Sequence, residues 1–581
     1  MKRHAVLTPR RSLLVLVLLL AVCPGPGVRS ASAAMGDYCQ VPPYVIQSVP
    51  PNVMLIVDNS GSMFNFAYYD GFTTAITSDD NMCNASGSPC TGFTDPGTWP
   101  NYKYYGYFNP DFWYAYGANR FYPTAPKAGT GITGERAKLA SEWDGNFLNW
   151  LTMRRTDILR KVLTGGKTTT GEGSGYDRLV AEIADCDGRG KYRRIANADL
   201  YTPWNGTRKI NVITNGGSCN GSGSGTSSFE VRNDPGGGDG TGIDAGYNVA
   251  LRVPLPVEGV LQSGVGARGR IGVTFYNVSD GGYVQVPVAA SNLASAVNQI
   301  NLTRPNANTP LGETLWTIVG DFAQQSSISG YNSPGGTGPL YNGGDYQMNN
   351  NNDPMNFGSG GSPRWPVCQK SFVLLITDGE PCSDGDLPTN ILNYPTGKSA
   401  YQCSGGGCPA VDNSTALTGG VGTFSFPAST FPSCGAGGNT AGIESVALFM
   451  HTNDVRNSPT IGTNDIAGFQ NLTLYTVFAF GQDSSILKFA AINGGFEDID
   501  GSNTPNQWDE WDKNHDGVPD TYYEATDGAK LEQAVKDAFS GILKRASSGT
   551  AASVLASGEG SGANLIQAIF YPRRRFGNNL I

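Results

Sequence analysis

Two uninterrupted apolar runs constrain the fold of this chain more than any other feature. They are Val53–Val57 and Phe372–Ile376, and each ends directly at a polar loop. A strand that is apolar at every position has both of its faces buried, which is typical of the central strands of a parallel sheet. The two runs therefore predict a sheet that is covered by helices on both sides.

The remaining periodic segments fit such a sheet. Further strands are predicted at 270–276 and 473–480. Helices are predicted at 147–162, 291–300, 311–323, about 440–453, from Ser484 and at about 527–545. Strands that alternate with helices predict an α/β fold with a doubly wound, mostly parallel sheet.

Long insertions interrupt this pattern, because glycine contributes 78 residues and proline 35 of the 581. We expect one domain over 45–545 that carries four of them. They are an irregular aromatic-rich loop at 64–130, a β-rich insertion at about 170–265, disulfide-rich loops at 325–440 and a calcium loop at 496–524. Residues 546–581 form a C-terminal extension.

The N-terminus has the layout of a secretory signal peptide over residues 1–34. Basic residues precede the apolar run Leu13–Val22, and the small residues Ala31–Ala34 follow it. The run is too short to span a bilayer. The sequence therefore predicts export across the inner membrane.

Charge and cysteine usage agree with an exported protein. The net charge is −9, and removing a leader with five positive charges brings it to −9 − 5 = −14. An acidic chain excludes nucleic acid as a partner and suits divalent cations. Ten cysteines remain after Cys23, which favours disulfides. Candidate local pairs are Cys83/Cys90, Cys368/Cys382 and Cys403/Cys408, whereas Cys39, Cys186, Cys219 and Cys434 have no evident partner.

Catalytic signatures are missing from the sequence. Three histidines, of which His4 lies in the leader, leave little room for a histidine-based triad or a zinc site. No G-x-S-x-G, P-loop or dinucleotide fingerprint occurs. We therefore expect a protein that is not an enzyme.

Polar loops follow the apolar strands. The first strand ends in Asp58-Asn59-Ser60-Gly61-Ser62, and Phe372–Ile376 is followed by Thr377-Asp378-Gly379. Thr309 lies just before the helix at 311–323. Loops at the carboxyl ends of parallel strands can meet at one crevice. Together Asp58, Ser60, Ser62, Thr309 and Asp378 offer oxygen ligands for Mg²⁺ or Mn²⁺. For the D-x-S-x-S segment alone, the alternative is a capped helix start.

This pattern resembles the metal-ion-dependent adhesion site of von Willebrand factor A domains. The resemblance implies a von Willebrand A-like fold. It also implies that the hydroxyl groups ligate the ion directly and that the carboxylates act mostly through water. The ion would then accept an acidic group from a partner.

A second cation loop is predicted near the C-terminus. Asp512, Asn514, Asp516 and Asp520 alternate around Gly517, and Val518 would offer its carbonyl, as in the first part of a calcium loop. Position 12 is Tyr523 rather than glutamate, so the loop is not an EF-hand. Candidates for further Ca²⁺ ligands are Asp498 and Asp500. The alternative is a solvated acidic turn.

Nine aromatic residues crowd the segment 102–116. They would form either a contact surface or local packing of the inserted loop, and we favour packing.

Several stretches resemble the N-terminal half of the PilC/PilY family of type IV pilus tip adhesins and biogenesis factors. They are Trp143–Trp150 with the helix after it, Asn308–Leu311, Phe496–Ala525 and Ser547–Ala552. The resemblance implies minor pilins and the type IV pilus machinery as partners, a surface or host ligand, and a location in the periplasm, on the outer surface or at the pilus tip. Such proteins continue into a β-propeller-like half. We expect that half to be absent here, or to be supplied by a separately encoded partner.

The sequence leaves three alternative functions for this protein. The first is a pilus-associated adhesin or assembly factor with a divalent-metal adhesion site, stabilised by calcium. The second is a secreted metal-dependent binding protein unrelated to pili. The third, a secreted hydrolase, lacks a nucleophile–base pair in the sequence.

Overall fold

The computed structural model describes residues 49–68, 103–182, 191–215, 228–234, 246–324, 340–358, 364–394, 442–547, 552–554 and 567–569, with short gaps inside several of these ranges. All of them belong to one compact unit, Gln47–Ile581. The predicted leader and every cysteine lie outside the described residues, so the expected export signal and disulfides are not addressed by the structure.

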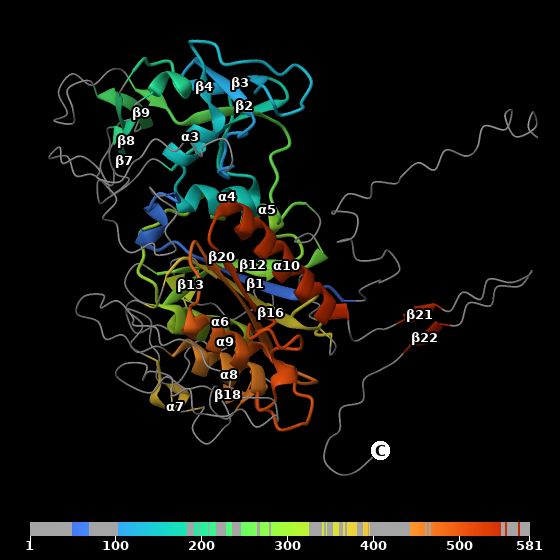
Figure 1. Ribbon diagram of the computed structural model, residues 1–581. Coiled ribbons are helices and arrows are strands. Elements are labelled where there is room, and N and C mark those ends of the chain that lie inside the picture. Colours follow the sequence, from blue (N-terminus) through green and yellow to red (C-terminus); the bar gives the residue numbers. More distant parts are fainter. Residues whose placement is uncertain are drawn as a thin grey trace, which may run out of the picture. The chain divides into compact units, whose positions relative to one another are not determined.

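A central sheet of eight described strands organises the fold (Figure 1). Its spatial order is β15 (Gly344–Asp345), β14 (Leu340–Tyr341), β13 (Gly282–Ala289), β12 (Arg270–Tyr276), β1 (Asn52–Val57), β16 (Ser371–Thr377), β19 (Leu472–Ala479) and β20 (Tyr522–Ala525). Five adjacent strands, β12, β1, β16, β19 and β20, are parallel to one another, whereas β13 is antiparallel to β12. The α/β fold with a mostly parallel sheet is therefore confirmed.

Helices cover both faces of this sheet (Figure 1). On one face lie α4 (Arg155–Thr164), α5 (Leu293–Leu302) and α10 (Gly528–Ser547); on the other lie α6 (Leu311–Ala323), α8 (Ile443–Thr452) and α9 (Ser485–Gly495). The central strand alternates between the two cores, because Val53 and Leu55 pack with the first group, whereas Met54 and Ile56 pack with the second. Burial on both sides explains why every position of this strand is apolar.

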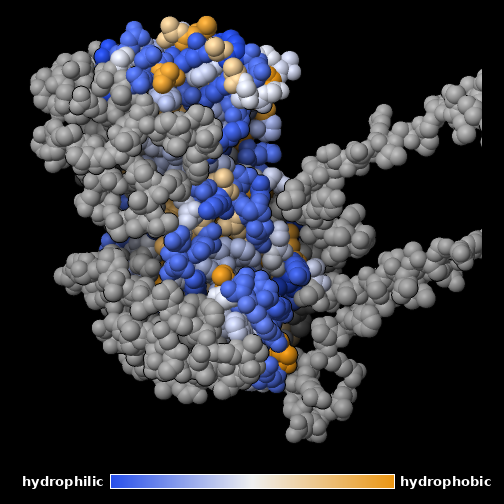
Figure 2. Space-filling view, in the orientation of Figure 1, coloured by the Kyte–Doolittle hydropathy of each residue, from blue (hydrophilic) through white to orange (hydrophobic). Residues whose placement is uncertain are grey.

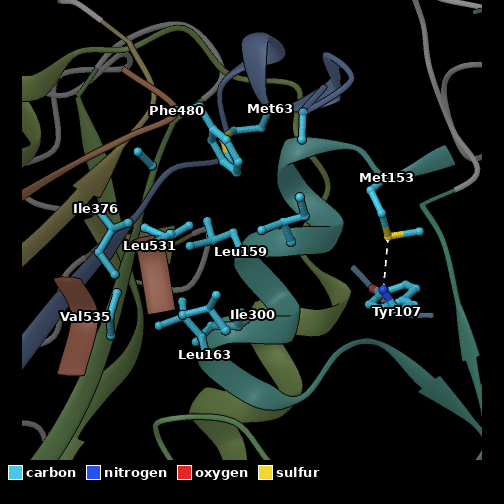
Figure 3. Close-up of a cluster of buried hydrophobic side chains, with 14 of the residues drawn as sticks. Met63, Tyr107, Met153, Leu159, Leu163, Ile300, Ile376, Phe480, Leu531 and Val535 are labelled. Carbon is cyan, nitrogen blue, oxygen red and sulfur yellow. Dashed lines mark hydrogen bonds between the residues drawn. The ribbon is translucent and has the colours of Figure 1, made fainter. Parts of the chain in front are cut away.

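The first of these cores is formed by side chains far apart in the sequence. Figure 3 shows Leu159 of α4 and Ile376 of β16 directed toward the same cluster as Leu531 and Val535 of α10. The outward side of α10 carries exposed polar residues and is mostly hydrophilic (Figure 2). Among the described residues, no helix combines the length and the apolar character that a membrane span requires.

A second sheet gathers segments that we expected to form separate insertions. It runs β4 (Trp143–Asp144), β2 (Phe112–Gly117), β3 (Arg120–Pro126), β11 (Ala250–Pro254), β6 (Tyr176–Val180) and β5 (Thr168–Thr169). β11 pairs with both β3 and β6, which joins the aromatic-rich segment to the β-rich one. The expectation of an irregular loop over 64–130 is therefore wrong for 112–126, where a hairpin forms.

Smaller elements complete the described chain. A four-stranded sheet runs β10 (Tyr247–Asn248), β9 (Ser228–Asp234), β8 (Arg208–Asn215) and β7 (Lys191–Ile195). Two strand pairs and several short helices remain: β17 (Asn457–Ser458) with β18 (Gly462–Thr463), β21 (Ala552–Val554) with β22 (Gln567–Ile569), η1 (Gly61–Phe64), α3 (Gly145–Thr152), η4 (Ala198–Leu200), α7 (Thr389–Leu392) and η6 (Trp508–Glu510).

The aromatic residues of the 102–116 segment mostly pack inward. Tyr107, Phe108 and Tyr114 are buried in the first core, and the ring of Phe108 makes edge contacts with Tyr114 and Phe121. Such edge-to-face pairs add to the free energy of burial. These described aromatics therefore support local packing rather than an open contact surface.

The predicted helix at 147–162 is two helices, α3 and α4. Between them, Met153 and Arg154 are extended. This break is held by the segment after η1, because the N–H of Ala67 donates to the carbonyl of Met153 and the N–H of Arg155 donates to that of Asn65. α4 then ends at Gly165, whose φ of 86° suits glycine at a helix C-terminus.

Candidate metal centre

The segment after β1 forms a sharp turn that is closed by the side-chain carboxylate of Asp58. Asp58 is buried, and its Oδ1 accepts a hydrogen bond of 2.7 Å from the N–H of Ser60. This turn brings the hydroxyl oxygens of Ser60 and Ser62 within 2.8 Å of each other. The D-x-S-x-S spacing thus places one carboxylate and two hydroxyls at the carboxyl end of the central strand.

The loop after β16 interlocks with this turn. Oδ2 of Asp58 accepts hydrogen bonds from the hydroxyl of Thr377 at 2.7 Å and from the N–H of Asp378 at 3.1 Å. In the opposite direction, the hydroxyl of Ser62 donates to Oδ1 of Asp378 over 2.6 Å. Two carboxylates from neighbouring parallel strands therefore lie side by side.

The third loop, before α6, docks on the first through the backbone. The N–H groups of Asn306 and Ala307 donate to the carbonyl of Asn59, and the N–H of Gly61 donates to the carbonyl of Ala307. A methyl group placed on Gly379 would lie 3.9 Å from the hydroxyl oxygens of both Ser62 and Thr309. The structure therefore brings all five residues predicted for this site together.

Burial and mutual repulsion act on the two carboxylates. The pKa of Asp58 is raised to about 7, first by burial and then by the negative charge of Asp378, although hydrogen bonds from Ser60 and Thr377 oppose this. Paired buried carboxylates are stabilised when a cation lies beside them. The set of three hydroxyls and two carboxylates consists of hard oxygen donors, which fits a small divalent cation such as Mg²⁺.

Arg155 is a member of this site that the sequence interpretation missed. Its guanidinium donates to Oδ2 of Asp378 over 2.8 Å, and both side chains are buried. Arg155 and Asp378 are 223 positions apart. No spacing rule connects an arginine at the start of one helix to a carboxylate after a distant strand, so the sequence offered no signal for this contact.

The acidic loop that contains Asp512 closes on its own side chains. The fully buried Asp512 accepts hydrogen bonds of 2.7 Å from the N–H of Gly517 and from the indole of Trp508. The N–H of Asp516 lies 3.1 Å from Oδ1 of Asn514, and Oδ1 of Asp516 accepts from the N–H of Val518. Asp512, Asn514, Asp516 and Val518 thus lie in one tight turn, in which Gly517 has a φ of 88°. The fifth predicted ligand, Asp520, follows this turn, and its N–H donates to the carbonyl of Trp511.

Asp498 and Asp500 gather around Glu510, a residue absent from the sequence prediction. Carboxylate oxygens of the three residues lie within 4.8 Å of one another, with Glu510 buried and the two aspartates exposed. Each carboxylate also accepts hydrogen bonds from nearby N–H groups, such as that from Ile499 to Glu510. Among the described residues, this acidic cluster is the group of three carboxylates whose oxygen atoms converge, whereas Asp512, Asp516 and Asp520 do not form such a group.

A match to a known family lies in the segment between the first and third loops. Residues 97–232 match the family described as PilY1 homolog, small alpha/beta domain. A type IV pilus biogenesis factor PilY1 homolog from Xylella fastidiosa (strain Temecula1 / ATCC 700964) is 35% identical over 100 residues, which are 17% of this chain and 6% of that protein. The aligned part is thus a small fraction of that relative.

Among solved structures, the chain is similar to the pilus adhesin SpaC from Lactobacillus rhamnosus GG. The identity is 11%, the TM-score is 0.21, and the alignment covers 75% of this chain and 43% of that one.

Proposed function

We propose that this chain, whose residues 97–232 match the PilY1 homolog, small alpha/beta domain, is an exported, non-enzymatic adhesin or assembly factor of type IV pili. In this proposal its von Willebrand A-like domain binds partners through a divalent metal ion. The single observation that supports this most is the convergence of Asp58, Ser60, Ser62 and Asp378, at the carboxyl ends of β1 and β16, with Thr309 in the loop before α6.

In this proposal the three hydroxyls and the two aspartates hold Mg²⁺ or Mn²⁺. When bound, the ion supplies an electrophilic position for an acidic group of a partner. Partners of the proposed function are minor pilins, the pilus machinery, a separately encoded propeller protein, and a surface or host ligand. The arrangement of β1, β16 and α6 around three loops resembles a von Willebrand A domain, and this resemblance supports the proposal.

We expect Ser62→Ala to weaken Mn²⁺ binding at least tenfold, because the variant removes one of the direct hydroxyl ligands, and tenfold corresponds to about 1.4 kcal/mol. Electron paramagnetic resonance of free Mn²⁺, with Mg²⁺ as competitor, measures the affinity. Ser540→Ala, on the exposed side of α10, is the matched control and leaves the affinity unchanged. Equal affinities of wild type and Ser62→Ala would contradict the metal site.

The pilus assignment has its own test. Purified protein is expected to capture minor pilins from envelope extracts of piliated cells, identified by mass spectrometry. The Ser540→Ala variant serves as a second bait that retains the intact site. Saturable Mn²⁺ binding without any captured pilin would instead favour a secreted metal-dependent binding protein unrelated to pili.

Calcium is proposed to bind the loop formed by Asp512, Asn514, Asp516, Val518 and Asp520, with Asp498 and Asp500 as candidates for additional ligands. An ion there offsets repulsion among the carboxylates and fixes the turn that precedes β20 and α10. Ligand binding to the folded state alone stabilises it by about 2.7 kcal/mol at a hundredfold excess over Kd.

We therefore expect Ca²⁺ to raise the melting temperature, and Mg²⁺ to raise it less because it prefers a more regular, hydrated site. The double variant Asp516→Ala, Asp520→Ala should lose most of the calcium effect, whereas Asp537→Ala on α10 should keep it. Differential scanning calorimetry measures both. An undiminished calcium shift in the double variant would identify the loop as a solvated acidic turn.

A further inference from the structure

We infer that Arg155 is a positioning residue of the metal centre, which sets the charge of the site so that a bound divalent cation attracts one carboxylate from a partner. The inference rests on the proposed function and adds a residue to the site. Arg155 lies within the segment that matches the PilY1 homolog domain. That segment would therefore supply a residue of the metal centre, in addition to extending the central domain.

Backbone contacts fix Arg155 beside the first metal loop. The chain leaves Ser62 through η1, and residues 65–67 then lie against the extended residues between α3 and α4. Phe66 forms an antiparallel bridge with Arg154, and the carbonyl of Asn65 accepts from the N–H of Arg155. The position of Arg155 is thus coupled directly to the D-x-S-x-S segment.

Side-chain contacts then direct the guanidinium to Asp378. One oxygen of this carboxylate accepts from Arg155 and the other accepts from the hydroxyl of Ser62. The side chains of Arg155 and Asp378 are 6% and 0% exposed, and the guanidinium also lies over the ring of Phe480. Little water can screen the positive charge of Arg155, so this charge acts on the neighbouring oxygen atoms of the site.

A count of formal charges gives the consequence. When a bound cation keeps both carboxylates ionised, Asp58 and Asp378 contribute −2 and Arg155 contributes +1, so these three described side chains carry a net −1. A divalent cation brings it to +1, and a single carboxylate from a partner then makes the site neutral. Without Arg155 the site would carry −2 and would already be neutral with the cation bound. Arg155 therefore lowers the affinity of the site for the metal ion and raises the affinity of the metal-bound site for a carboxylate.

The test measures two affinities that change in opposite directions. We expect Arg155→Gln to bind Mn²⁺ on the order of tenfold more tightly than wild type, because a buried positive charge near the ion is removed. With Mn²⁺ bound, acetate is the carboxylate probe, and its displacement of metal-bound water is followed by water-proton relaxation. The variant should need severalfold more acetate. Arg155→Lys, which keeps the charge, should restore both values toward wild type.

The outcomes separate this inference from the proposed function. Tighter Mn²⁺ binding and weaker acetate binding in Arg155→Gln support the role of Arg155. Equal values in wild type and Arg155→Gln overturn it and leave the metal site intact, whereas no saturable Mn²⁺ binding by wild type overturns both. Circular dichroism reports whether each variant folds. If Arg155→Gln does not fold, tenfold tighter Mn²⁺ binding by Arg155→Lys would still contradict a role based on charge.

Discussion

Replacing Arg160 by methionine is expected to lower the free energy of unfolding by about 3–5 kcal/mol. The variant leaves the buried carboxylate of Glu182 with the more distant Lys167, at 3.5 Å, in place of its buried arginine partner. The guanidinium of Arg160 donates to Glu182 over 2.7 Å, and both side chains are almost fully buried. Burial alone would raise the pKa of Glu182, but Arg160 and Lys167 lower it to about 2. The carboxylate is thus held ionised in the protein interior by this partner.

Further hydrogen bonds make Arg160 the centre of a network. Its remaining N–H groups donate to the carbonyls of Ile300 and Thr303 at the end of α5, and the N–H of Glu182 donates to Asp157 on α4. The network therefore ties α4 and α5 to the segment that follows β6. Methionine keeps the aliphatic volume of arginine and supplies none of these donors.

Urea unfolding followed by circular dichroism measures this loss. The matched control is Lys536→Met, which breaks a half-exposed pair with Glu532 and should cost no more than about 0.5 kcal/mol. Adding Glu182→Gln to Arg160→Met should recover part of the loss, because the unpaired buried charge is removed. An Arg160→Met cost as small as that of Lys536→Met would show that the network does not stabilise the fold.

The central sheet could be predicted because its signals are local. Each of the apolar runs at 53–57 and 372–376 predicts a strand that is buried on both faces, and both are central strands in the structure. The helix predicted at 311–323 has the bounds of α6, since its apolar side chains recur with helical periodicity. The meeting of the loops after β1 and β16 followed from parallel pairing. The loop with Thr309 instead connects α5 to α6, and backbone hydrogen bonds to Asn59 hold it at the site.

Long-range pairings could not be predicted in this way. The helix at 147–162 has continuous helical periodicity, yet it breaks at Met153 and Arg154 because those residues bond to the segment after η1. β3 pairs with β11 over more than a hundred residues, and no local pattern announces such a partner. The place of Arg155 in the candidate metal site could not be predicted either, because its contact with Asp378 exists only in the folded chain.

The acidic segment shows the same division between local and distant signals. The alternation from Asp512 to Asp520 is a local pattern, and the structure forms one turn from it. Glu510 joins Asp498 and Asp500 because η6 directs its carboxylate back to the N–H groups of Ile499 and Gln507. That return of the chain depends on the packing of Trp508 and Trp511, which the sequence does not specify.

Acidification is expected to destabilise the protein between pH 6.5 and pH 4 through His451, at the end of α8. This half-buried imidazole lies between two carbonyl oxygens, those of Leu472 and Phe496, at 3.2 and 2.9 Å from its ring nitrogens. Burial and then the positive charge of Arg545 lower the pKa of His451 to about 4, although the two carbonyls oppose this. The folded state therefore prefers the neutral ring.

The direction of the effect follows from proton binding. Below pH 6.5 the unfolded chain takes up a proton at His451, whereas the folded chain does so only near pH 4, so the unfolded state gains stability as the pH falls. The two pKa values correspond to at most about 3 kcal/mol, and solvent at this half-buried ring keeps the effect below that limit. The contribution is fully present above pH 6.5 and is lost as the pH falls toward 4.

The measurement is urea unfolding of wild type and His451→Gln at several pH values from 7.5 to 4. The glutamine variant removes the titrating ring and keeps a hydrogen-bond donor for one of the two carbonyls. The difference in the free energy of unfolding between the two proteins cancels the carboxylates, which titrate in both. We expect wild type to lose stability relative to the variant as the pH falls through this range. Parallel pH profiles for wild type and His451→Gln would show that His451 titrates alike in the folded and unfolded chains.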